Sequence, residues 1–177
     1  MILVKYNSIM KDFFELIRWN HWAKNVFVLA PLFFSGDYYD ISNVAQVLKA
    51  FFIFCLVSSC VYIFNDLLDY EADSAHNKKR LRPLPSGRIS KPMAMLILSI
   101  MFISACLLLY TLRMPINFIY VVLFYALINL IYSMGLKHIP VLELILVSSG
   151  FVLRLVGGGE APVSYTHLRA HETGRNL

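Results

Sequence analysis

Residues 64–87 contain three aspartates followed by a cluster of basic residues. Together these side chains could bind a metal ion and a phosphate group. On a helix of about 100° per residue, Asp66, Asp69 and Asp73 fall within an arc of about 60°, with Asn65 at its margin. Like charges this close repel one another, so something positive should compensate them. Either the neighbouring basic residues neutralise the carboxylates, or a divalent cation bridges them. Because Mg²⁺ prefers oxygen ligands, it is the cation that we expect.

The residues after the aspartates supply groups that bind phosphate. The cationic side chains are Lys78, Lys79, Arg80 and Arg82. Arginine binds phosphate oxygens in bidentate fashion, and lysine binds them as a point charge. Pro83 and Pro85 stop a helix, and Ser86-Gly87 favours a turn. The stretch is typical of a cradle for magnesium diphosphate, and equally of a solvated loop between membrane helices.

The composition indicates an integral membrane protein. Hydrophobic residues make up 58 % of the 177 residues, against about 45–50 % in soluble domains. The net charge of +5 is explained by basic loops beside a membrane, and without a basic and aromatic stripe no nucleic-acid partner is expected. Cys55, Cys60 and Cys106 lie in apolar runs without CxxC spacing, which predicts small buried side chains rather than metal ligands or disulfides.

The elements that must position these groups are long apolar segments. The predicted transmembrane helices are 22–36, 44–66, 92–112, 115–134 and 139–157. Basic residues gather before the first span, near 67–91 and near 135–138, which are alternate connections and therefore one side of the membrane. The positive-inside rule makes that side cytoplasmic. We expect an all-α, multi-pass transmembrane helix bundle whose N-terminus and charged loop are cytoplasmic.

Two charged residues fall inside the last predicted span. Glu143 lies about one turn into it, and Arg154 lies near its other end. They are about 16 Å apart along a helix, so they cannot pair with each other. Charged residues inside a membrane are functional candidates by default, although an arginine near a helix end can also extend its charge to the interface.

The sequence changes character near its end. We expect residues 1–163 to form the N-terminal part of a transmembrane domain. Residues 164–177 are polar and lack helical periodicity, which predicts a disordered tail or a non-native end. The run SYTHLRAHET resembles a translated sequencing adapter, and on that interpretation this chain is a fragment of a longer protein.

The aspartate pattern N-D-x-x-D-x-x-x-D at residues 65–73 is similar to the first aspartate-rich motif of the UbiA superfamily of membrane prenyltransferases. Three stretches resemble its decaprenyl-phosphate phosphoribosyltransferase branch: HWAKNVFVLAPLFFSG (21–36), residues 65–87, and YSMGLKHIPVLELILVSSGFVLRLVGG (132–158). The resemblance covers about residues 18–163. It implies a bundle of about nine transmembrane helices in a bacterial inner membrane, of which about five are present here.

The resemblance also implies a reaction. That branch moves 5-phosphoribose from phosphoribosyl pyrophosphate to a polyprenyl phosphate with Mg²⁺. Asp66, Asp69 and Asp73 would hold the metal and the diphosphate leaving group as catalytic residues. The substrate-binding residues carried over are Lys24, Asn25, Asn65, Lys79, Arg80, Arg82, Tyr132 and Lys137. Prenyl transfer from a prenyl diphosphate to an aromatic or other polar acceptor, and a non-catalytic transporter or scaffold, remain as alternatives.

Two features depart from the resembled family. Glu143 stands where the branch tends to have an aspartate, and no second aspartate-rich motif follows it. The chain would therefore carry half of an active site, and we expect it to have little or no activity alone.

Overall fold

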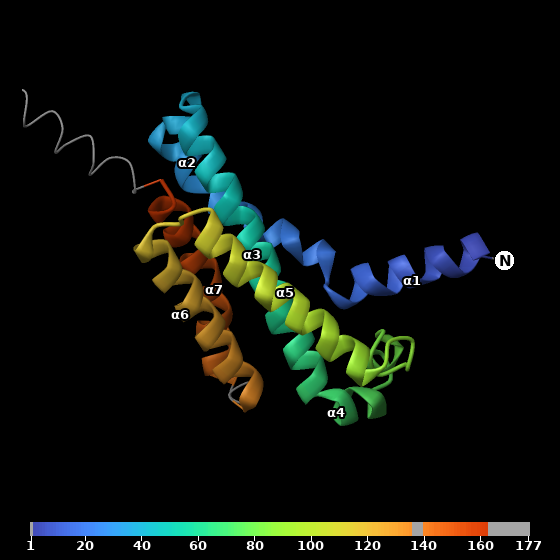
Figure 1. The fold of residues 1–177 in the computed structure, drawn as a ribbon. Helices are drawn as coiled ribbons and strands as arrows, with labels where there is room; N and C mark the ends of the chain where they lie inside the picture. The colour runs from blue at the N-terminus through green and yellow to red at the C-terminus, as the bar shows by residue number, and fades with distance from the viewer. Residues whose placement is uncertain (1, 136–139, 163–177) are drawn as a thin grey trace, which may run out of the picture.

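The protein is all-α over the residues that the computed structural model describes, which are 2–135 and 140–162, with side chains from residue 9 onward apart from those of residues 140 and 143. These residues form seven α-helices and three 3-10 segments (Figure 1). In chain order they are α1 (Ile2–Leu16), η1 (Trp19–Leu29), α2 (Ala30–Ser35), η2 (Asp37–Tyr39), α3 (Ile41–Leu68), α4 (Tyr70–Ala75), η3 (Lys79–Leu81), α5 (Lys91–Thr111), α6 (Ile116–Met134) and α7 (Pro140–Glu160).

Three of the described helices are long and apolar enough to cross a membrane: α3, α5 and α6. They match the predicted spans 44–66, 92–112 and 115–134 to within a few residues. Their boundaries follow from local chemistry. The Asp40 carboxylate accepts a hydrogen bond from the Ser42 N–H at 2.8 Å and caps α3. Ser90 caps α5 in the same way, with a proline in the first turn, where a missing N–H costs nothing.

The predicted span 22–36 is helical but changes type within the segment, and it is not among the three helices long and apolar enough to cross a membrane. This segment is wound as a 3-10 helix to Leu29 and becomes α-helical only from Ala30. Pro31 cannot donate the hydrogen bond that an α-helix requires, and the Ala30 N–H bonds to the Phe27 carbonyl, three residues back. The last predicted span, 139–157, corresponds to α7, which falls outside the group of three apolar helices.

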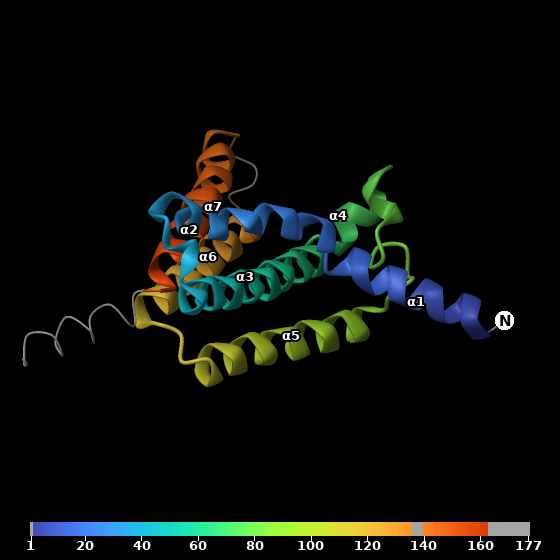
Figure 2. The ribbon, with the colours of Figure 1, turned by 90° about the horizontal axis from the view of Figure 1, so that it is seen from above.

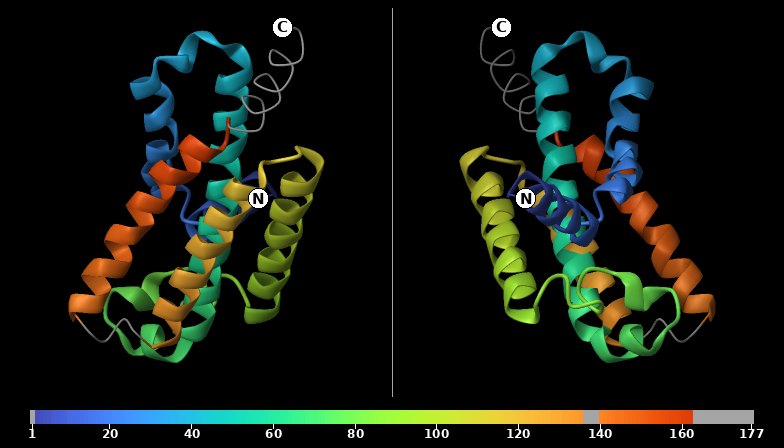
Figure 3. Two further views of the ribbon diagram at one scale, coloured as in Figure 1. Left: turned by 90° about the vertical axis from the view of Figure 1, so that its left-hand side faces the viewer. Right: turned by 90° about the vertical axis from the view of Figure 1, so that its right-hand side faces the viewer.

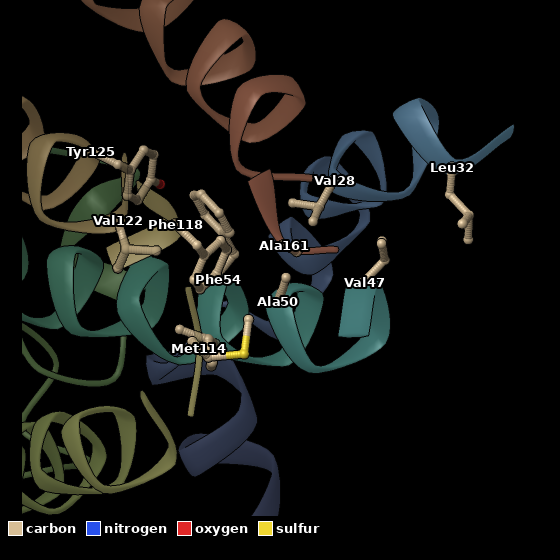
Figure 4. Close-up of a cluster of buried hydrophobic side chains, with 11 residues drawn as sticks. Val28, Leu32, Val47, Ala50, Phe54, Met114, Phe118, Val122, Tyr125 and Ala161 are labelled. Carbon is tan, nitrogen blue, oxygen red and sulfur yellow. The ribbon is translucent and has the colours of Figure 1, made fainter. Parts of the chain in front are cut away.

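Helix α3 is the centre of the bundle. It packs against η1, α5 and α6, and α7 packs against η1 and α6. One core cluster lies between these elements, where the Phe54 ring meets the edges of Phe118 and Tyr125 (Figure 4). A second cluster includes Leu16 and Ile17 with Leu84 of the charged loop. The charged loop is therefore packed into the fold rather than suspended in solvent.

The arrangement places the chemistry-bearing segments at one end of the bundle. Figure 3 shows that α4, the loop that leads to α5, the end of α6 and the start of α7 gather at the same end. The turn between α5 and α6 and the η2 segment lie at the opposite end. Helix α1 projects sideways from the other helices (Figure 2).

Candidate active site

A single arginine joins two of the three predicted aspartates. Arg82 Nη1 lies 2.6 Å from Asp73 Oδ2 and 3.2 Å from Asp66 Oδ1. Both carboxylates are buried, with Asp66 at 2 % and Asp73 at 1 % exposure. Arg18 bonds to the same Asp66 oxygen, and Lys79 Nζ lies 3.3 Å from Asp73. The basic cluster therefore neutralises these two carboxylates directly, and the solvated-loop alternative does not hold for them.

The helix geometry explains why the aspartates converge. Helix α3 ends at Leu68, but the Asp69 N–H bonds to the Asn65 carbonyl at 2.9 Å and the Asp73 N–H bonds to the Asp69 carbonyl at 2.8 Å. The i to i−4 pattern thus persists into α4 with only a slight break. Asp66 and Asp73 remain seven residues, or about two turns, apart on one face, which is the face that Arg82 contacts.

The basic loop, which is the part of the charged loop between α4 and α5 (residues 76–90), folds back because its own backbone is closed by turns. The Arg82 N–H bonds to the Lys79 carbonyl, and the Ser86 N–H bonds to the Arg82 carbonyl. Gly87 takes a left-handed backbone with φ of 76°, which glycine adopts without strain. Arg88 then pairs with Asp12 and Glu15 of α1 and donates to the Leu81 carbonyl at 2.7 Å. Arg88 therefore fixes this loop against α1.

Beside these ion pairs lies a cavity of about 360 Å³, which we call the polar cavity. It is bounded by η1, α3, α6, α7 and the basic loop. Its polar lining residues are Arg18, His21, Lys24, Tyr62, Asn65, Asp69, Lys79, Arg82, Tyr125, Asn129, Tyr132, Ser133 and Arg154. Five of these are lysine or arginine and only Asp69 is acidic, so the cavity suits an anionic ligand.

A smaller cavity of about 260 Å³ adjoins the polar cavity and shares Arg18, His21 and Arg82 with it. The buried Asp66 carboxylate lines this second space. Burial, and then the charges of Lys24, Arg18 and Arg82, lower the pKa of His21 below its ordinary value of 6.5. His21 is thus disposed to remain neutral beside these cations.

The far wall of the polar cavity holds a buried network around Arg154. Arg154 Nε donates to Asn25 Oδ1 at 2.7 Å, and Nη2 donates to the Tyr125 hydroxyl at 2.9 Å. Asn25 is fully buried and donates in turn to Ser58 Oγ and Cys55 Sγ. Arg154 is therefore held inside the bundle, and the alternative that its charge extends to the interface is wrong.

The structure brings most of the predicted site residues together. Around the polar cavity it places Lys24, Asn65, Asp69, Lys79, Arg82 and Tyr132. Asp66 and Asp73 do not line this cavity, but they contact its lining residue Arg82. Asn25 likewise contacts the lining residue Arg154. Arg80 is exposed and does not line either cavity. Lys137 lies outside the described residues.

Two contributors carried no sequence signal that marked them as site residues. Arg18 is 48 positions from Asp66, and its place among the basic residues before the first predicted span does not distinguish it from them. It adopts a left-handed backbone, with φ of 52°, at the junction of α1 and η1. Tyr125 reads in the sequence as one more aromatic residue of a membrane helix. Only a map of long-range contacts would have identified either one.

The donor set of the site fits a hard divalent cation. Among the described residues no group of three histidine, cysteine or acidic side chains is already arranged to hold a metal ion. Arg82 nevertheless occupies a position between two carboxylates, where one cationic centre satisfies both. Carboxylate and amide oxygens are the ligands that Mg²⁺ prefers, so the chemistry of these side chains fits that ion.

Comparison with known proteins gives a consistent result. The model of the UbiA prenyltransferase family matches residues 26–169. The chain is 37 % identical to decaprenyl-phosphate phosphoribosyltransferase of Mycolicibacterium smegmatis over 158 residues, which are 87 % of this chain and 49 % of that protein. The enzymes of the same name from Mycobacterium tuberculosis and Corynebacterium glutamicum are each 36 % identical over 83 % of this chain, and 49 % and 45 % of their own lengths. The chain thus spans about half the length of these relatives.

Proposed function

This chain belongs to the UbiA prenyltransferase family, and from that membership we propose that it is part of a Mg²⁺-dependent membrane transferase that moves 5-phosphoribose from phosphoribosyl pyrophosphate to a polyprenyl phosphate. The observation that carries the proposal is the polar cavity, whose cations lie beside three carboxylates. Similarity to decaprenyl-phosphate phosphoribosyltransferases favours this donor over a prenyl diphosphate.

The proposal includes a membrane topology. Residues 22–36 and α7 would join α3, α5 and α6 as crossing segments, which gives five in this chain. The 3-10 winding rises about 2.0 Å per residue against about 1.5 Å in an α-helix, so residues 22–36 reach further than their number suggests. The basic N-terminal segment and the loop near 67–91 then face the cytoplasm, where phosphoribosyl pyrophosphate and Mg²⁺ are available.

Each polar group has a role in this scheme. Asp66, Asp69 and Asp73 would hold the magnesium ion with help from Asn65, and the bound ion would neutralise and orient the diphosphate. Arg82 balances two of these carboxylates in the arrangement described above. With these carboxylates holding a cation, Arg82 and Lys79 would be available to bind diphosphate oxygens.

The reaction needs positioning and charge stabilisation more than proton transfer. The acceptor phosphate is already anionic near pH 7, so no general base is required. One of its oxygens bonds to the anomeric carbon while the bond to diphosphate breaks, and the diphosphate leaves with the electron pair. Negative charge then grows on the leaving group, where Arg82, Lys79 and Lys24 lie around one cavity and stabilise it.

Ligand binding by this chain in lipid nanodiscs tests the proposal. We expect phosphoribosyl pyrophosphate to bind only with Mg²⁺, and Asp69→Asn to weaken that binding by about tenfold or more. Asp37→Asn, which changes an exposed aspartate at the opposite end of the bundle, is the matched control. Binding of farnesyl diphosphate in place of phosphoribosyl pyrophosphate would favour prenyl transfer. Equal binding by the Asp69→Asn variant would refute the site.

A further inference from the structure

We propose that Arg154 forms a second anion subsite in the polar cavity, which binds a phosphate monoester group of one of the two substrates without a metal ion. The inference rests on the proposed function, because it assigns a further part of the same cavity. Arg154 is only 5 % exposed, yet it lines the polar cavity. A deeply buried cation beside an open polar space is the starting observation.

None of the described partners of Arg154 carries a negative charge. Its three hydrogen bonds go to the Asn25 amide oxygen, the Tyr125 hydroxyl and the Gly150 carbonyl, all of which are neutral. Among the described residues no carboxylate lies within ion-pair distance of it. A buried charge without a counter-ion is costly, so the missing negative charge is expected from a ligand.

The guanidinium also has N–H donors that no described residue accepts. Arginine has five N–H groups, and the hydrogen bonds to described residues use one each on Nε, Nη1 and Nη2. One N–H therefore remains on each terminal nitrogen. Two donors on the two terminal nitrogens are the arrangement that binds phosphate oxygens in bidentate fashion. The Tyr125 ring, 4.9 Å from the guanidinium carbon, holds its plane in place.

The subsite is separate from the carboxylate end of the cavity. Asn25, which bonds to Arg154, donates to Ser58 Oγ at 3.2 Å. Ser58 precedes Asn65 by seven residues on α3, which is about 10 Å along the helix axis. The network around Arg154 thus reaches α3 about two turns from Asn65, which with Asp69 lines another part of the same cavity. A second phosphate group, apart from the diphosphate at the aspartates, is the ligand that this separation along α3 favours.

The chemistry of the proposed substrates supplies a group for this subsite. Phosphoribosyl pyrophosphate carries a phosphate monoester on its ribose besides its diphosphate. The lipid acceptor carries a phosphate monoester on an apolar chain. Either group would bring negative charge to Arg154 while the diphosphate stays at the aspartates. The shared ligand is a phosphate monoester, and the two sources can be distinguished by experiment.

Isothermal titration of this chain in nanodiscs, with EDTA present, tests the subsite. The two probes are ribose 5-phosphate and farnesyl monophosphate. We expect wild type to bind at least one of them, Arg154→Gln to bind it about ten- to a hundredfold more weakly, and Arg154→Lys to fall between. Arg113→Gln, at an exposed arginine beyond α5, is the matched control and should bind as wild type does. The probe that loses affinity identifies the source of the phosphate.

The thermal midpoint without and with the probe separates binding from folding. A merely structural Arg154 would lower the midpoint of the unliganded Arg154→Gln variant and leave the ligand-induced rise unchanged. The proposal requires the rise itself to disappear. If the glutamine variant does not fold, the weaker binding of Arg154→Lys decides the question.

Failure of this inference is distinguishable from failure of the proposed function. Equal binding of both probes by wild type and Arg154→Gln, or binding of neither by wild type, overturns the subsite. If Mg²⁺-dependent binding of phosphoribosyl pyrophosphate is then still lost in Asp69→Asn, the proposed function stands without the subsite. If wild type itself shows no Mg²⁺-dependent binding of phosphoribosyl pyrophosphate, the proposed function is overturned.

Discussion

Arg82 Nη1 lies 2.6 Å from Asp73 Oδ2, so the basic loop is joined to α4 through a carboxylate that is almost fully buried. The same nitrogen reaches Asp66, so the loop and two segments of the aspartate motif are held by one guanidinium. A group that both stabilises the fold and neutralises the carboxylates in this way should respond to a competing cation. Stability of variants at this position is therefore informative about the site.

Replacing Arg82 with glutamine should destabilise the protein in a way that Mg²⁺ partly reverses. The substitution leaves two buried carboxylates short of one partner. Breaking a buried ion pair costs about 3–5 kcal/mol, and we expect the lower part of this range because Arg82 is partly exposed. Thermal unfolding in detergent, with EDTA and with Mg²⁺, measures both effects. Arg80→Gln, at an exposed arginine two residues earlier, should change neither midpoint appreciably. An Arg82→Gln midpoint that is indifferent to Mg²⁺ would contradict the cation exchange.

His21 should make the protein less stable in mild acid. Its pKa is lowered in the fold, mainly by burial and then by Lys24, Arg18 and Arg82. Near pH 6 the unfolded chain therefore binds more protons at His21 than the folded protein does, and the free energy of unfolding falls as pH drops below about 6.5. The contribution of His21 to the slope fades as pH rises above that value, because the unfolded residue then also loses its proton.

Comparison of wild type with His21→Gln between pH 5 and pH 8 measures this effect. The difference in the free energy of unfolding should shift in favour of the glutamine variant as pH falls and should level off near neutral pH. Parallel curves for the two proteins would show that His21 titrates alike in both states.

Arg88 should control how firmly α1 is attached. It pairs with Asp12 and Glu15 on α1 and with the Leu81 carbonyl. Because Glu15 is well exposed, the effect of Arg88→Gln on overall stability should be only about 1 kcal/mol. Backbone hydrogen exchange in residues 9–16 and 79–90 should nevertheless become faster, since the contact that joins these segments is lost. Arg113→Gln serves as the control. Equal exchange rates in the two variants would show that Arg88 does not hold α1 in place.

The sequence predicted the parts of the fold that depend on local pattern. Helices α3, α5 and α6 are long apolar runs with caps or prolines at their starts, and their limits could be read closely. The aspartate spacing likewise predicted that Asp66, Asp69 and Asp73 share a face. Arg82 contacts both Asp66 and Asp73, and Asp69 lines the polar cavity that Arg82 also lines. In these cases the periodicity of a helix is enough to say which side chains meet.

The sequence could not predict what depends on distant packing. The 3-10 winding of η1 reflects Pro31 together with close contact to α7, which lies more than a hundred residues later. The pair Arg154 and Asn25 is separated by 129 positions, and no periodicity links them. Arg18 meets Asp66 only because α1 turns sharply into η1. Each of these contacts depends on tertiary packing, and no local pattern in a single sequence indicates it.

A close approach of α7 to the backbone of η1 yields the last prediction. A Cβ atom added to Gly158 of α7 would lie 1.9 Å from the Val28 carbonyl oxygen, so an alanine there must push α7 away from η1. Overpacking costs about 1–3 kcal/mol, and the shift should also stretch the hydrogen bond between Arg154 and Asn25, which lie on the same two elements. Gly159→Ala is the matched control, because its Cβ atom would meet nothing within 4 Å and alanine favours a helix by about 0.5–1 kcal/mol over glycine. Thermal unfolding should therefore place Gly158→Ala below wild type and Gly159→Ala at or slightly above it. The reverse order would mean that η1 and α7 do not pack backbone to backbone, and the buried wall around Arg154 would lose its support.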